Sequence, residues 1–187
     1  MDEKNIMDIL VETGAMLKGH FKLSSGLHSD SYVQCARCLK YPEYATFFAE
    51  KLYIWTSRLA PDVIVSPALG GIIIGWEVAR AFNLPFMFTE REEGVVKFRR
   101  GFSLEKNSKV LVVEDVFTTG KSTLEVCEAV EGCGSFVVGA CSIIKRGNCA
   151  FDFPSFSLIE MDLKTYPPQD CPMCRENIPL AKPGSRK

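Results

Sequence analysis

The chain has 187 residues, of which 47% are hydrophobic and 24% are charged. This is the composition of an ordinary globular domain, and it excludes a disordered or fibrous protein. The 22 basic and 23 acidic residues give a net charge of −1, which argues against a general binder of nucleic acid or of an anionic membrane surface. Apolar stretches such as residues 72–76 and 136–144 are far shorter than the roughly 18 residues of a membrane span, and the N-terminus does not resemble a signal peptide. We therefore expect a cytoplasmic protein.

The hydrophobic pattern predicts helices and strands that alternate along most of the chain. An initial helix, with Gly19 as its stop, is followed by a turn-rich segment flanked by short strand-like pieces and by a second amphipathic helix. The expected elements, in chain order, are helix 5–17, turns 20–30, helix 41–59, strand 62–66, helix 72–82, strand 85–89, a β-hairpin or mobile loop over 90–104, strand 109–115, helix 124–130, strand 134–144 and a proline-rich tail after Tyr166.

The strands of this alternating region are unbroken apolar runs, which is typical of parallel strands that are covered on both faces. The chain is therefore expected to form an α/β protein with a doubly wound parallel sheet. Its length predicts a single domain over residues 1–187, with 166–187 as a loop-rich tail.

The segment Val110-Leu-Val-Val-Glu-Asp-Val-Phe-Thr-Thr-Gly-Lys-Ser-Thr is the most informative part of the sequence. Its loop, 118–122, offers backbone N–H groups and hydroxyls to a phosphate at the start of a helix. A nucleotide-binding P-loop is excluded, because that motif needs a glycine five positions before Gly120 and this chain has Asp115. Adjacent acids at the end of a buried strand require donors, and the hydroxyls of a ribose 5-phosphate would supply them. The alternative is a solvated strand end.

This segment resembles the phosphoribosyl-pyrophosphate signature of type I phosphoribosyltransferases, which is an apolar run, two acids, two further residues and Thr-Thr-Gly-x-Ser. Two other segments narrow the resemblance to the orotate phosphoribosyltransferases. They are Phe21-Lys-Leu-Ser-Ser-Gly-Leu-His-Ser-Asp and Lys145-Arg-Gly. The ending, from Cys171-Pro-Met-Cys through Lys182-Pro-Gly-Ser-Arg-Lys, is similar to the tail of a bacterial and archaeal branch of that family.

The resemblance implies the type I phosphoribosyltransferase fold, with a small hood made from the two ends of the chain and a flexible β-hairpin loop. It implies transfer of the phosphoribosyl group of 5-phospho-α-D-ribose 1-diphosphate (PRPP) to orotate, which gives orotidine 5′-monophosphate in pyrimidine biosynthesis. It also implies Mg²⁺ carried by the substrate without protein ligands, and a homodimer.

The resemblance also implies roles for individual residues. In the family, the two acids bind the ribose hydroxyls and the loop after them holds the 5-phosphate. The implied PRPP-binding residues are Glu114, Asp115, Val116, Phe117, Thr118, Thr119, Gly120, Lys121 and Ser122. The implied orotate-binding residues are Ser25, Thr118 and Arg146, and the implied diphosphate loop is Ala68, Leu69, Gly70 and Gly71. The implied catalytic residues are Arg91, Lys97 and Asp115.

Two features depart from the family pattern. The diphosphate loop has Leu69 and Gly70 where many members carry a lysine, and the hairpin has no histidine after Arg91. Lys97, Arg99 and Arg100 supply cations there, but their separate roles are open, and a solvated hairpin face is the alternative.

Two other functions stay open at this point. A phosphoribosyltransferase for another nucleobase would keep the phosphate loop, and a non-enzymatic regulator could use the same fold to sense the sugar diphosphate.

Eight cysteines are many for a chain without a secretory signal, and they favour free thiols or metal ligands over a disulfide framework. Cys35/Cys38 and Cys171/Cys174 form two Cys-x-x-Cys pairs. The interpretation we favour is that Cys171 and Cys174 are free thiols or a local disulfide in a structural tail. A zinc site shared by all four cysteines is the alternative. His20 and His28 are interpreted as surface or packing residues.

Overall fold

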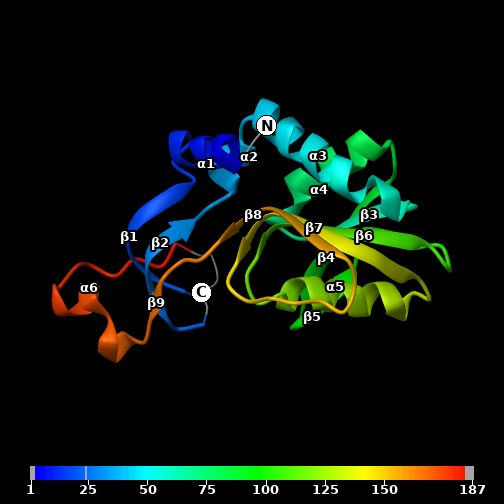
Figure 1. Ribbon diagram of the computed structural model, residues 1–187. Coiled ribbons are helices and arrows are strands. Elements are labelled where there is room, and N and C mark those ends of the chain that lie inside the picture. The colour runs from blue at the N-terminus through cyan, green and yellow to red at the C-terminus, as the bar shows by residue number, and fades with distance from the viewer. Residues whose placement is uncertain (1–2, 24, 184–187) are drawn as a thin grey trace.

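The computed structural model describes residues 3–23 and 25–183. Its main sheet has the strand order β5-β4-β3-β6-β7-β8 (Figure 1). All neighbouring strands are parallel except β5, which turns back antiparallel on β4. The strands are β3 (Val63–Pro67), β4 (Phe86–Glu92), β5 (Val95–Phe98), β6 (Lys109–Phe117), β7 (Phe136–Arg146) and β8 (Ser155–Met161). A mostly parallel sheet between helices confirms the predicted α/β class.

Helices cover both faces of this sheet. Successive side chains of its central strand, β6, point in opposite directions, so they pack against helices on opposite faces. In β6, Leu111 and Val113 pack on one side, in a core shared with α3 and α4, while Val110 and Val112 pack on the other, against α5. Figure 1 shows α3 and α4 on one face and α5 on the opposite face. The helices of the chain are α1 (Glu3–Glu12), α2 (Ala36–Leu39), α3 (Pro42–Thr56), α4 (Gly71–Phe82), α5 (Lys121–Gly132) and α6 (Pro172–Arg175), with 3₁₀ turns η1 (Ser57–Leu59) and η2 (Pro168–Asp170).

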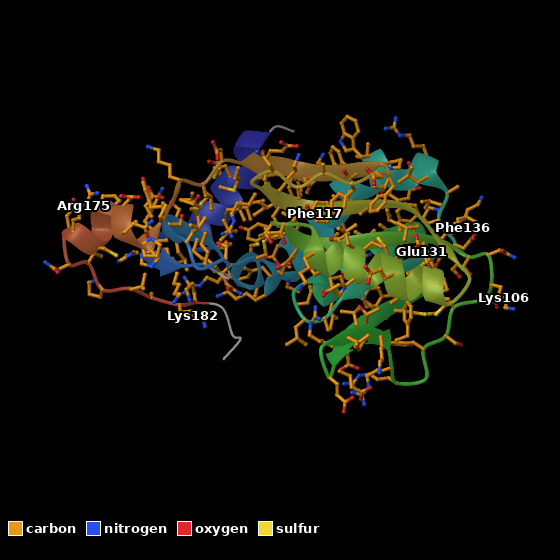
Figure 2. All side chains as sticks on the ribbon, turned by 90° about the horizontal axis from the view of Figure 1, so that it is seen from below. Lys106, Phe117, Glu131, Phe136, Arg175 and Lys182 are labelled. Carbon is orange, nitrogen blue, oxygen red and sulfur yellow. The ribbon has the colours of Figure 1, made fainter. Side chains whose placement is uncertain are left out.

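A second, three-stranded sheet is built from both ends of the chain, in the order β1-β2-β9. Its strands are β1 (Met16–Lys22), β2 (His28–Val33) and β9 (Thr165–Tyr166). This small sheet lies beside the main sheet (Figure 1). Figure 2 shows Lys106, Glu131 and Phe136 at one end of the molecule and the tail residues Arg175 and Lys182 at the other. The carboxyl ends of the main strands therefore face the small sheet.

Several predicted elements differ from those in the structure. The first helix ends at Glu12 rather than continuing to residue 17, because Gly14 has a φ of +66° and β1 begins at Met16. Strand β8 was not predicted. On α3, Phe48 and Leu52 form the buried face together with smaller residues, whereas Trp55 is 53% exposed and stacks on Phe156.

In the part of the chain that the structure describes, no helix is long and apolar enough to cross a membrane. The division into one domain with a tail at 166–187 stays a proposal.

Candidate active site

Three chain segments meet at the carboxyl edge of the main sheet. The loop 68–71 follows β3, the loop 118–120 follows β6, and Arg146 ends β7. Because β3, β6 and β7 are neighbours in the sheet, these segments lie at one edge. In open α/β sheets, this edge is where ligands bind.

The predicted phosphate loop leads directly into α5. Gly120 takes a φ of +76°, and the helix begins at Lys121. A side chain at Gly120 would also meet the Phe151 ring at 2.9 Å, so the turn has room only for glycine. The first N–H groups of α5 have no partner within the helix and point out of its N-terminus, which makes the position suitable for a phosphate.

Glu114 is turned toward the start of α5. The residue is 8% exposed, and its carboxylate accepts hydrogen bonds from Ser122 Oγ at 2.6 Å and Thr123 Oγ1 at 2.7 Å. The carboxylate thus anchors the first turn of the helix. The structure shows Glu114 hydrogen-bonded to Ser122 of the phosphate loop and to Thr123 of α5. A contact of Glu114 with the ribose stays a prediction.

Asp115 lies against the predicted diphosphate loop. A Cβ atom at Gly70 would stand 2.7 Å from Asp115 Oδ1, so only glycine allows the loop to approach the carboxylate. The peptide bond between Ala68 and Leu69 is cis. Burial raises the pKa of Asp115 above its ordinary value, although the Val116 N–H donates a hydrogen bond to Oδ1 at 3.0 Å. The structure therefore brings Asp115 together with the loop 68–71.

Arg146 stands half-buried at the end of β7, and burial lowers its pKa. Among residues 3–23 and 25–183, no acidic side chain forms an ion pair with it. Its electrostatic neighbour is Tyr32, on β2 of the small sheet, whose pKa is raised by burial and, more weakly, by Asp115. A guanidinium without an acidic partner is suited to receive the carboxylate of a ligand.

Tyr32 and Cys35 were missed by the sequence analysis. Tyr32 interacts electrostatically with Arg146, and the Cys35 thiol donates to the backbone oxygen of Asp115 at 3.9 Å. No local motif marks Tyr32, and the Cys-x-x-Cys pair that contains Cys35 pointed to a metal rather than to this site. The packing of the small sheet against the main sheet brings both residues to this edge.

The structure also places three further predicted site residues, Phe117, Lys121 and Ser25. Phe117 is buried and packs edge to face on Phe151 with ring centroids 5.1 Å apart, so only its backbone is open to a ligand. Lys121 is exposed, with its ammonium 3.9 Å from Glu125. Ser25 lies in an exposed turn before β2, at the opposite end of that strand from Tyr32, so a single chain does not bring it to Arg146.

The hairpin β4–β5 carries the predicted loop cations, and each of them is paired with an acid. Arg91 forms an ion pair with Glu125 of α5 and donates to the Gly94 carbonyl at 2.6 Å. The other pairs lie within or beside the hairpin: Lys97 with Glu92 at 3.6 Å, Arg99 with Glu92 at 3.1 Å and Arg100 with Glu90 at 2.8 Å. The hairpin is thus docked along α5, and each predicted loop cation is paired with an acid in this structure.

We expect Arg91→Ala to lower kcat by roughly tenfold and to change the KM of either substrate less. An interaction that forms only when the hairpin leaves α5 and closes over the ligand stabilises the transition state more than the ground state. Steady-state kinetics measure both constants. Lys106→Ala is the matched control and should keep wild-type kinetics. Lys106 lies in an exposed turn before the amino end of β6, at the opposite end of that strand from the candidate active site. A kcat unchanged in Arg91→Ala would show that the hairpin is only a solvated structural element.

Comparison with known proteins agrees with this geometry. Residues 47–155 match the family model described as the phosphoribosyl transferase domain. The chain is 45% identical over 189 residues to the orotate phosphoribosyltransferase of Caldanaerobacter subterraneus subsp. tengcongensis, with 100% of both chains covered.

Solved structures share the fold at lower identity. The orotate phosphoribosyltransferase of Aeropyrum pernix has a TM-score of 0.70 at 23% identity and covers 83% of this chain and 93% of its own. The adenine phosphoribosyltransferase of Thermoanaerobacter pseudethanolicus has a TM-score of 0.62 at 16% identity, with 70% and 88% covered. The fold is thus common to enzymes for different bases, whereas the relative that is similar over the full length of the chain is an orotate phosphoribosyltransferase. The chain belongs to the phosphoribosyl transferase family, and within it to the orotate phosphoribosyltransferases.

Proposed function

We propose that this protein transfers the phosphoribosyl group of PRPP to N1 of orotate and releases diphosphate. The observation that carries the choice of orotate is Arg146, a half-buried cation without an acidic partner in the described chain, at the same edge as the phosphate loop. Orotate differs from uracil by a carboxylate, and a guanidinium recognises a carboxylate through two parallel hydrogen bonds. Adenine and hypoxanthine have no such group.

Each segment at this edge has a part in the transfer. The start of α5 and the loop 118–122 hold the 5-phosphate, and Asp115 accepts hydrogen bonds from the ribose hydroxyls. The loop 68–71 presents its backbone to the diphosphate. As the bond between C1 of the ribose and the diphosphate breaks, positive charge develops on the sugar, and the Asp115 carboxylate stabilises it.

The leaving diphosphate accumulates negative charge. Mg²⁺ enters on the sugar diphosphate, as part of the substrate, and neutralises part of that charge. Arg91 and Lys97 supply further positive charge once the hairpin β4–β5 closes. Closure also excludes water, which would otherwise hydrolyse the activated sugar. We propose no protein ligand for this magnesium ion.

The test is release of diphosphate with orotate, uracil, adenine and hypoxanthine offered side by side, with and without Mg²⁺. We expect turnover with orotate only, and only with Mg²⁺. Turnover with a purine base would replace the proposed substrate. Tight binding of the sugar diphosphate without release of diphosphate would favour a regulator instead.

We also propose a homodimer in the cytoplasm. An apolar groove of about 470 Å³ runs beside α4 and is lined by residues such as Ile73, Trp76 and Phe88. Trp76 is 59% exposed and Ile73 is 44% exposed, and exposed apolar side chains in one patch are typical of an interface. Sedimentation equilibrium measures the mass, for which we expect the value of two chains.

A further inference from the structure

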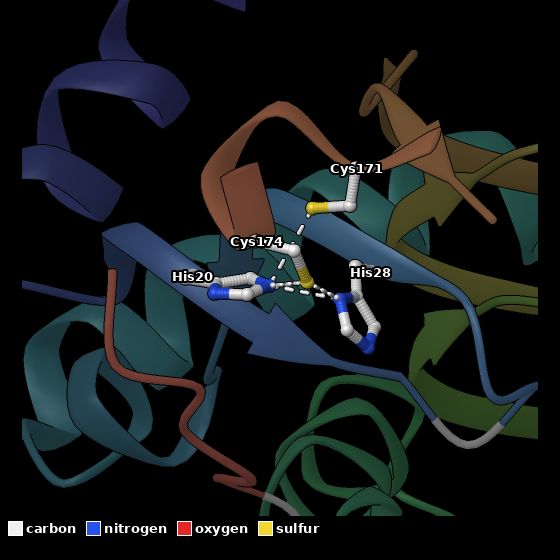
Figure 3. A group of neighbouring side chains, drawn as sticks. All are labelled: His20, His28, Cys171 and Cys174. Carbon is white, nitrogen blue, oxygen red and sulfur yellow. Dashed lines mark hydrogen bonds between the residues drawn. The ribbon is translucent and has the colours of Figure 1, made fainter. Parts of the chain in front are cut away.

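Four side chains from the two ends of the chain converge away from the active site (Figure 3). His20 comes from β1, His28 from β2, and Cys171 and Cys174 flank the start of α6. The ligand atoms of all four lie within 4.8 Å of one another. His20, His28 and Cys171 are buried, whereas Cys174 is at the surface. None of the four lies in the segment 47–155 that matches the family model.

The distances fit a tetrahedral metal ion. Cys171 Sγ lies 3.5 Å from His20 Nε2, and Cys174 Sγ lies 3.6 Å from His20 Nε2 and 3.3 Å from His28 Nδ1. With Zn–S bonds of about 2.3 Å and Zn–N bonds of about 2.0 Å, a tetrahedron has S···N edges of about 3.5 Å. The two imidazole nitrogens are 2.8 Å apart, and the corresponding N···N edge is about 3.3 Å, so the rings would separate by about 0.5 Å around the ion.

The hydrogen bonding of His20 leaves its other nitrogen directed at the cluster. Nδ1 lies 2.8 Å from the Ile178 carbonyl oxygen, so it carries the proton and donates. Nε2 therefore has a lone pair, and three potential donors surround it: His28 Nδ1, Cys171 Sγ and Cys174 Sγ. One lone pair accepts only one of these protons well, whereas a cation accepts electron pairs from all four atoms. A carbonyl behind a ligating histidine is also the usual outer support of a metal site.

The structure decides between the alternatives that the sequence left open for the cysteines. Cys171 and Cys174 are free rather than disulfide-bonded, and Cys35 and Cys38 do not join them. The Cys35 thiol faces the backbone oxygen of Asp115, and the Cys38 thiol donates to the Cys35 carbonyl at 3.0 Å. The zinc site shared by four cysteines, which was the alternative, therefore does not form, and His20 and His28, interpreted as surface or packing residues, lie beside Cys171 and Cys174 instead.

We propose that His20, His28, Cys171 and Cys174 form a structural Zn²⁺ site. Two thiolates and two imidazoles in tetrahedral arrangement are a ligand set that zinc prefers, and four protein ligands leave no open position for catalysis. Binding releases the two thiol protons as the cysteines ligate the ion.

The site would join the two chain ends that build the small sheet. Within the described residues, β9 pairs with β2 at His28–Tyr166 and Ser29–Thr165, Ser29 Oγ donates to the Lys164 carbonyl at 2.8 Å, and the tail adds a bridge between Phe21 and Ala181. A zinc ion bound there links the β1–β2 hairpin to the tail. Because β2 also carries Tyr32 beside Arg146, the ion supports the side of the active site that the small sheet supplies. Tyr32 is four residues from His28, about 13 Å along a strand, so the ion does not reach the substrate.

The test begins with the metal content of the full-length wild-type protein, purified without a metal-affinity tag. We expect one zinc per chain. A strong chelator should remove it and lower the melting temperature by roughly 10 °C, because a ligand that binds only the folded state stabilises it. Co²⁺ added to the metal-free protein should give the intense d–d bands of a tetrahedral site and a thiolate charge-transfer band.

Variants identify the ligands. Cys174→Ser changes a residue at the surface and should lose the zinc and the thiolate band of the Co²⁺ form. Cys133→Ser, at the end of α5, is the matched cysteine control and should keep one zinc per chain. Wild-type protein without stoichiometric metal, whose melting temperature is unchanged in chelator, would overturn the proposal. So would a zinc ion that Cys174→Ser retains. Since these readouts do not depend on turnover, they stand whichever base the enzyme accepts.

Discussion

Asp115→Asn is expected to lower kcat/KM for the sugar diphosphate by roughly 100-fold. A carboxylate that accepts charge-assisted hydrogen bonds from the ribose contributes about 1.5–3 kcal/mol, and the same charge stabilises the positive sugar in the transition state. An amide keeps the shape and the acceptor oxygen for the Val116 N–H, but it removes the charge. Initial rates at varied PRPP concentration measure the effect.

The same substitution should not destabilise the fold. Burial raises the pKa of Asp115 above its ordinary 3.8, so the folded state holds the proton more tightly than the unfolded state does. Its contribution to the free energy of unfolding is therefore most favourable at pH below 3.8, and it is lost as pH rises through the raised pKa. At neutral pH the buried charge costs stability, and asparagine removes that cost. We expect a melting temperature equal to or above that of the wild type.

Asp62→Asn is the matched control for this prediction. Asp62 accepts a hydrogen bond from the Lys109 N–H at the amino end of β6, at the opposite end of the strand from Asp115. The control variant should keep wild-type kcat/KM. If Asp115→Asn had normal kinetics, the assignment of Asp115 to the ribose would be wrong.

Arg146→Ala is expected to raise the KM for orotate by about 10- to 100-fold and to leave the KM for PRPP nearly unchanged. The loss of a charge-assisted pair with the orotate carboxylate accounts for this size. Arg146→Lys should recover only part of the affinity, because an ammonium lacks the planar pair of donors that a carboxylate matches. Steady-state kinetics with each substrate varied in turn separate the two constants.

The control for Arg146 is Arg58→Ala, which removes an exposed arginine near the end of η1. Its KM values should equal those of the wild type. If Arg146→Ala weakened both substrates equally, the guanidinium would hold the edge of the sheet together rather than recognise orotate.

The main sheet and the phosphate loop could be predicted because the residues that form them are close together in the chain. The apolar run of β6, the following acids and Thr118-Thr-Gly lie within a dozen residues, and each determines the conformation of its own neighbourhood. An unbroken apolar run of this kind is typical of a strand that helices cover on both faces. Boundaries were less predictable: residues 13–17 fit a helical pattern, yet Gly14 takes a positive φ and the hairpin with β2 draws Met16 and Leu17 into β1.

Side-chain partners depended on the tertiary structure, because they join residues that are far apart in the chain. The pattern of β6 does not reveal that Glu114 turns to the hydroxyls of Ser122 and Thr123. Tyr32 reaches Arg146 only because the small sheet packs at the carboxyl edge of the main one.

The cluster of His20, His28, Cys171 and Cys174 is the largest difference between what the sequence predicted and what the tertiary structure shows. His20 and Cys171 are separated by 151 positions, and their side chains meet because the tail returns to pair with β1 and β2. The spacing within each Cys-x-x-Cys pair raised a zinc site only as the alternative, and cysteines alone could not reveal that two histidines lie beside Cys171 and Cys174. A strand pattern states which residues are extended, whereas the packing of the chain ends decides which of them share one ion.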